Sequence, residues 1–203
     1  MEQFEYVMVL VSIIVALAIT HLLMAIAETI HRIRGLGEPI KLDIVYSLWI
    51  GYVFIWLVSF WWWEFKFQET AVEWSLGLYF FIVSYAALLF LLATILVPHR
   101  MRGVSNGYEY FMQGRKWFFG VLILIVPLDF ADSMLKGDDY NLRAAYEFQL
   151  FGKSIWISWG PPLVAYVVGI VAKRRAFQLA AAILAFTGQL IYLFQELDVL
   201  GSW

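Results

Sequence analysis

The sequence predicts an all-α integral membrane protein in which six transmembrane helices form one bundle, as a single domain over residues 1–203. Of its 203 residues, 63% are apolar and 15% are charged, whereas soluble domains are about 45–50% apolar and about 25% charged. A soluble domain of this size could not bury so much apolar side chain. The composition therefore excludes an ordinary soluble enzyme, and a net charge of −2 offers no basic surface for nucleic acid.

Six apolar stretches, separated by short loops, each reach the roughly 20 residues that a helix needs to cross a bilayer. They cover residues 4–32, 40–66, 71–97, 115–136, 150–172 and 176–199. The first differs from a cleaved signal peptide, because acidic rather than basic residues precede it and no small-residue cleavage site follows. The fifth contains Gly160, Pro161 and Pro162, whose prolines remove two backbone donors, so we expect this helix to be broken or kinked there.

Loop charges predict the orientation of this bundle. If both termini lie outside, ten of the fourteen basic residues fall in the three inside loops: Arg32, Arg34, Lys41, Arg100, Arg102, Arg115, Lys116, Lys173, Arg174 and Arg175. Basic residues concentrate on the cytoplasmic side of membrane proteins. We therefore expect six spans with an outside N-terminus and an outside C-terminus, in a bacterial-type inner (plasma) membrane.

The fourth span carries the most unusual polar residues. Asp129, Asp132, Ser133 and Lys136 share one helical face through their spacing of three, four and seven residues. Asp132 and Lys136 are placed to form an ion pair near the outer surface. Asp129 lies deeper, where an ionisable residue is costly and becomes a candidate functional site.

Other polar groups fall at nearly the depth of Asp129, in a layer slightly outside the membrane midplane. Gln189 of the sixth span and Ser158 of the fifth belong to this layer, together with the two prolines and Tyr85 of the third span. Tyr192 shares a helical face with Gln189. Asp129, Asp132, Gln189, Ser158 and Tyr192 are thus candidates for transport or ion binding; helix packing is the alternative role for Gln189.

A second polar group lies toward the inside end of the first span. His21 and Glu28 share one face, and Glu28 is placed to pair with Arg32 one turn later. His21 is the sixth candidate residue, able to bond across helices or to carry a proton. The Glu28 and His31 pair matches half of a di-iron motif, but no second copy exists, so we expect no metal site.

Two functions fit these observations. The first is a channel or transporter for a small ion or solute with its polar site at Asp129. The second is a structural or assembly subunit of a membrane complex, working as a homo-oligomer or with a membrane-protein partner. An enzyme is disfavoured because nucleophile, zinc-protease and phosphate-loop motifs are absent from the sequence. The cofactor, if any, is unknown at this stage, and the lipid bilayer is the expected environment.

Overall fold

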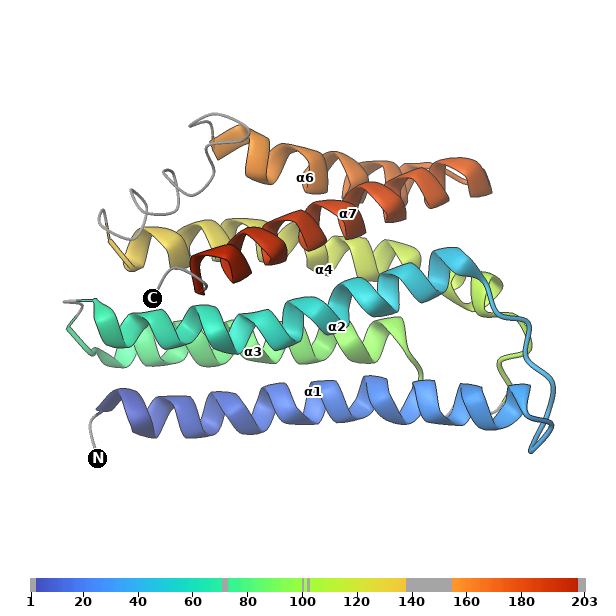
Figure 1. Cartoon of the computed structure of the whole chain (residues 1–203), viewed down its shortest axis with the longest axis horizontal. Helices are drawn as coiled ribbons and strands as arrows, with labels where there is room; N and C mark the ends of the chain where they lie inside the picture. Colours follow the sequence, from blue (N-terminus) through green and yellow to red (C-terminus); the bar gives the residue numbers. More distant parts are fainter. Residues whose placement is uncertain (1–2, 71–72, 100, 102, 138–154, 201–203) are drawn as a thin grey trace.

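The chain folds as a bundle of long α-helices. The computed structural model describes residues 3–70, 73–99, 101, 103–137 and 155–200 (Figure 1). The helices are α1 (Gln3–Ile33), α2 (Ile44–Phe65), α3 (Leu76–Leu96), α4 (Gly107–Leu135), α6 (Ile155–Val171) and α7 (Arg175–Leu200), with a 3₁₀ turn η1 (Lys66–Glu69) after α2. In the part of the chain that is described, β-structure is limited to one isolated bridge between Lys41 and Asn106.

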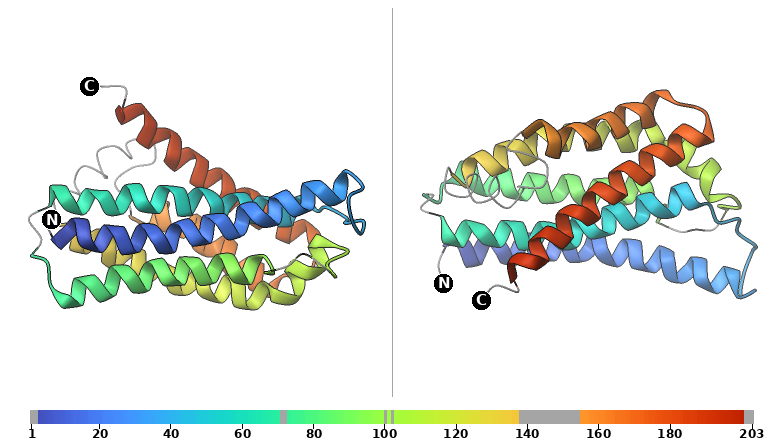
Figure 2. Two further views of the ribbon diagram at one scale, coloured as in Figure 1. Left: turned by 90° about the horizontal axis from the view of Figure 1, so that it is seen from below. Right: turned by 45° about the horizontal axis from the view of Figure 1, so that its top comes forward.

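The helices lie side by side along the long axis of the molecule, with α1 at one edge and α6 at the other (Figure 1). α1 packs on α2 and α3, α4 packs between α3 and α6, and α7 packs on both α2 and α6. The links from α1 to α2, from α3 to α4 and from α6 to α7 lie at one end of the bundle, whereas the α2–α3 link lies at the other end beside the N-terminus (Figures 1 and 2). The last turns of α2 and α4 meet at this second end, beside the N-terminus. Polar residues in those turns therefore come together.

Among the described residues, four helical segments are long and apolar enough to cross a membrane: Phe4–Ile33, Ile44–Gln68, Leu76–Leu96 and Gly107–Leu135. They fit a lipid environment, and they correspond to the first four predicted spans. The fifth and sixth predicted helices are also present, but their described apolar segments, Gly160–Val171 and Arg175–Ile191, are shorter. Residues 150–154 of the fifth prediction lie outside the described residues.

Two predicted helix features differ from the structure. α4 begins at Gly107 rather than at residue 115, because the Asn106 side chain accepts a hydrogen bond from the Tyr108 backbone nitrogen at 3.1 Å and caps a longer helix. α6 continues through Pro161 and Pro162, so the helix is not broken there, and the alternative expectation of a kink stays a prediction. The next turns of α6 pack Ala165, Tyr166 and Gly169 inside the bundle, and this packing offsets the lost proline donors.

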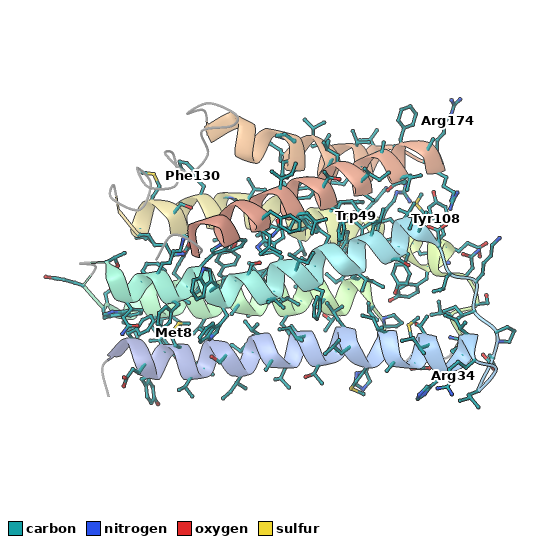
Figure 3. The ribbon with its side chains drawn as sticks, in the orientation of Figure 1. Met8, Arg34, Trp49, Tyr108, Phe130 and Arg174 are labelled. Carbon is teal, nitrogen blue, oxygen red and sulfur yellow. The ribbon has the colours of Figure 1, made fainter. Side chains whose placement is uncertain are left out.

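An aromatic cluster fills the centre of the bundle, where α2, α4 and α6 meet. The fully buried Trp49 ring packs edge-to-face on Phe118 and Phe119, with ring centroids 5.4 and 5.0 Å away. Gly169 of α6 faces the Phe119 ring so closely that a Cβ there would overlap it. Trp49, labelled in Figure 3, therefore holds α2 against α4, and Gly169 lets α6 approach α4.

Candidate functional site

A buried charged cluster, formed by Glu64, Asp132 and Lys136, joins the ends of α2 and α4. The Lys136 ammonium donates to Asp132 Oδ2, one turn earlier on α4, and lies 3.4 Å from Glu64 Oε1 in the last turn of α2. The exposed fraction of the side chain is 0% for Lys136, 1% for Glu64 and 6% for Asp132. The predicted Asp132–Lys136 pair is confirmed, and Glu64 is a member that the sequence did not indicate.

The 3₁₀ turn η1 closes this cluster from the end of the bundle. The Lys136 ammonium lies 4.7 Å from the centre of the Phe67 ring, a distance at which an aromatic face attracts a cation. Phe67 is 2% exposed and packs edge-to-face on Trp74. Within the described part of the chain, the ammonium therefore contacts two carboxyl groups and one aromatic ring.

Two carboxyl oxygens of this cluster lack a hydrogen-bond donor. They are Glu64 Oε2 and Asp132 Oδ1, both buried. The Glu64 and Asp132 carboxyl groups also lie within hydrogen-bonding reach of each other. Burying a hydrogen-bond acceptor without a donor costs folding free energy. The contact between the Glu64 and Asp132 carboxyl groups therefore requires a physical explanation.

Asp129 lies one turn before the charged cluster on α4. Its Oδ1 accepts a hydrogen bond from the Tyr85 hydroxyl of α3 at 2.8 Å. Tyr85 is 1% exposed, and its ring packs on Phe60 of α2 with centroids 4.8 Å apart. Asp129 and Tyr85, which the sequence placed in one layer, are in direct contact, so the polar site extends over α2, α3 and α4.

The remaining candidates of the outer layer do not complete this site in the described part of the chain. Gln189 on α7 is half-buried, and its Nε2 has no hydrogen-bond partner; the bond to Asp129 comes from Tyr85. The side chains of Ser158 and Tyr192 lie outside the described residues.

A pair of tyrosines joins α2 to α6. The hydroxyl groups of Tyr52 on α2 and Tyr166 on α6 are hydrogen-bonded to each other, and both residues are buried. Tyr52 also packs edge-to-face on Trp49 and Trp56. No sequence pattern indicates this pair, because it depends on how two distant helices are rotated.

The polar face of α1 has a different partner from the one the sequence suggests. His21 Nε2 lies 2.9 Å from the Val97 carbonyl oxygen, and Glu28 Oε2 accepts from the Met101 backbone nitrogen at 3.3 Å. The predicted Glu28–Arg32 pair is wrong, since buried Arg32 instead donates to carbonyl oxygens of the loops around it. These acceptors are Glu38, Pro39, Met101 and Val104.

These contacts lay the α3–α4 loop along the last three turns of α1. The backbone N–H and C=O groups of such a loop have no hydrogen-bond partners within a helix. In a membrane protein, side chains must form hydrogen bonds with them instead. The side chains of His21, Glu28 and Arg32 make these hydrogen bonds. His21 therefore has a structural partner, and nothing in the described contacts joins it to Asp129.

A small cavity of about 70 Å³ lies between α1 and this loop, with room for a few water molecules. His21 and Glu28 line one side, and His99 lines the other. The His21 and His99 rings are stacked with centroids 6.1 Å apart. Among the described residues, no three His, Asp or Glu side chains are grouped so that they could hold a metal ion.

No protein-family model, curated protein or solved structure matches this chain. Its function has to be argued from the residues of the site themselves.

Proposed function

We propose that this chain is a small multi-pass membrane protein that conducts or transports an ion, and that its site is the group of Glu64, Asp129, Asp132, Lys136 and Tyr85. One observation carries the proposal: three carboxyl groups and one ammonium gather inside the helix bundle. Ionisable groups within membrane-spanning helices are expensive and mark ion pathways and proton relays. A purely structural ion pair would need one carboxyl group rather than three.

The site is also built from three different helices. Glu64 comes from α2, Tyr85 from α3, and the two aspartates with Lys136 from α4 and its C-terminal cap. A site that joins several helices changes its contacts whenever one helix moves relative to another, as transport requires. This arrangement supports a site that opens and closes.

Six spans with both termini outside are part of this proposal. Figure 3 places Arg34 and Arg174 at one end of the bundle and Met8 and Phe130 toward the other. The positively charged end is the expected cytoplasmic end, which puts the site near the outer face. A bacterial-type inner membrane is the proposed location.

The deciding experiment measures flux and thermal stability on the same Asp129→Asn preparation. We expect wild-type protein in liposomes to carry proton or cation flux, and the variant to lose it while keeping its unfolding temperature. Glu109→Gln is the matched control, because this exposed carboxyl lies at the opposite end of α4. Wild-type liposomes without flux of H⁺, Na⁺ or K⁺, together with a stabilised Asp129→Asn variant, would end the transport proposal.

The second candidate is a structural or assembly subunit, working as a homo-oligomer or beside another membrane protein. The observation that favours it is that site residues bond one another, Tyr85 to Asp129 and Lys136 to both Asp132 and Glu64. Such contacts also glue helices together. Mass measurement in mild detergents and nanodiscs tests it, since a companion chain or a second copy is then required.

A further inference from the structure

We infer that the carboxyl groups of Glu64 and Asp132 share one bound proton beside the Lys136 ammonium, and that the ion bound and released here is H⁺ rather than Na⁺ or K⁺. The contacts and the charges of the cluster both favour the shared proton. The identity of the transported ion rests on the proposed function.

The hydrogen-bonding capacity of the two carboxyl groups favours one bound proton. Glu64 Oε2 and Asp132 Oδ1 are buried without a donor, although the two carboxyl groups lie within hydrogen-bonding reach. Two ionised carboxylates carry only acceptors and cannot bond each other. One proton turns one of the two carboxyl groups into a donor toward the other.

The net charge of the three buried groups also favours one bound proton. Lys136 contributes one positive charge, and Asp132 and Glu64 contribute two negative charges when both are ionised. All three residues are buried, with 1% to 4% of each residue exposed, so water does not screen the excess charge. One shared proton makes the cluster neutral.

The described contacts of the Lys136 ammonium differ from the ligand shell of a metal ion. A hard cation is bound by a shell of several oxygen ligands. Here the Lys136 ammonium contacts both carboxyl groups, and the Phe67 ring, which offers no oxygen ligand, lies 4.7 Å from it. The cluster therefore has the composition of a proton site with a built-in counter-ion.

Two further groups face this cluster and belong to the same titration. Asp129 lies one turn earlier on α4, and Tyr85 reaches it from α3. Among the described residues around Glu64 and Asp132, α3 contributes Tyr85, and α4 with its C-terminal cap contributes Asp129 and Lys136, while η1 contributes an aromatic ring. Asp129 lies three residues before Asp132, on the same face of α4.

Infrared spectroscopy of the wild-type protein in liposomes tests the shared proton directly. We expect the C=O stretch of a protonated carboxyl group at neutral pH, and its loss at strongly alkaline pH. Glu64→Gln should remove this band, because the introduced amide donates a hydrogen to Asp132 and replaces the shared proton without disturbing the fold. Thermal unfolding of the variant checks that it is folded.

Glu109→Gln, the same chemical change at an exposed carboxyl, should leave the band unchanged. Equal band intensity in wild-type and folded Glu64→Gln protein would overturn the shared proton. This outcome is independent of any flux.

Flux measurements test the identity of the ion. A pH gradient should collapse in wild-type liposomes, and Glu64→Gln should slow this about 100-fold, the lower end of what a positioned proton-transfer group contributes. Flux of Na⁺ or K⁺ that persists in Glu64→Gln would overturn H⁺ as the ion. No flux at all, with the infrared band lost in Glu64→Gln, would uphold the shared proton and reject the transport function.

Discussion

Tyr85 donates its hydroxyl hydrogen to Asp129 Oδ1 at 2.8 Å, and this bond ties α3 to α4 one turn away from the buried charged cluster. The Tyr85 ring is fixed by Phe60 of α2, so three helices meet at this contact. Because a buried carboxyl group needs donors, Tyr85 holds Asp129 in a defined orientation. The same bond would have to open for Asp129 to exchange an ion.

Replacing Tyr85 with phenylalanine should destabilise the bundle. Tyr85→Phe keeps the ring but removes the donor, and hydrogen bonds to charged groups contribute about 1.5–3 kcal/mol. Thermal or denaturant unfolding in one detergent measures the change. Tyr79→Phe on the same helix is the control, since within the described residues the half-buried Tyr79 hydroxyl shows no side-chain hydrogen bond. Equal losses in the two variants would contradict the role of the bond.

The local parts of this arrangement could be predicted from the sequence. The apolar stretches predict helices because burial in lipid requires length and composition alone, and Asp132 with Lys136 follows from the four-residue spacing within one helix. The start of α4 was predicted eight residues late, because polar residues such as Glu109 and Gln113 interrupt the apolar pattern while Asn106 caps the helix.

The contacts between helices could not be predicted in the same way. Glu64 follows three tryptophans at the end of an apolar stretch, and nothing in that pattern says whether it faces solvent or Lys136. Arg32 likewise has a local partner, Glu28, at a favourable spacing, yet its guanidinium binds loop carbonyl groups. Helix rotation and loop path decide both cases, and neither leaves a periodic signal.

Replacing Arg32 with lysine should loosen the end of the bundle that holds the α1–α2 and α3–α4 loops. The guanidinium donates to Met101 and Val104 carbonyl oxygens at 2.7 and 2.8 Å, and to the Glu38 carbonyl oxygen at 2.6 Å. A lysine cannot reproduce this fork of donors, so we expect a loss of about 2–3 kcal/mol. Unfolding measurements test the stability, and limited proteolysis of the α3–α4 loop tests the location. Arg34→Lys, at an exposed position, is the control and should change neither.

Reporter fusions should detect opposite sides of the membrane at the Ser105 position and at the C-terminus. The α3–α4 loop lies at the basic end of the bundle together with Arg34 and Arg174 (Figures 1 and 3), which is the expected cytoplasmic end. Both termini are expected outside. The same side at both fusion points would reject the six-span topology.

Replacing Gly169 with alanine should destabilise the packing of α6 on α4. A Cβ at this position overlaps the Phe119 ring, and Phe119 is held in turn by Trp49 at 5.0 Å and by Phe118 at 5.1 Å between ring centroids. The ring therefore cannot move aside freely, and overpacking of this kind costs about 1–3 kcal/mol. Unfolding in detergent measures the loss. Gly188→Ala on α7 is the matched control, because a Cβ there meets nothing within 4 Å; it should be neutral or slightly stabilising, since alanine favours a helix by up to about 1 kcal/mol. A Gly169→Ala variant as stable as Gly188→Ala would mean that α6 does not pack this closely on α4.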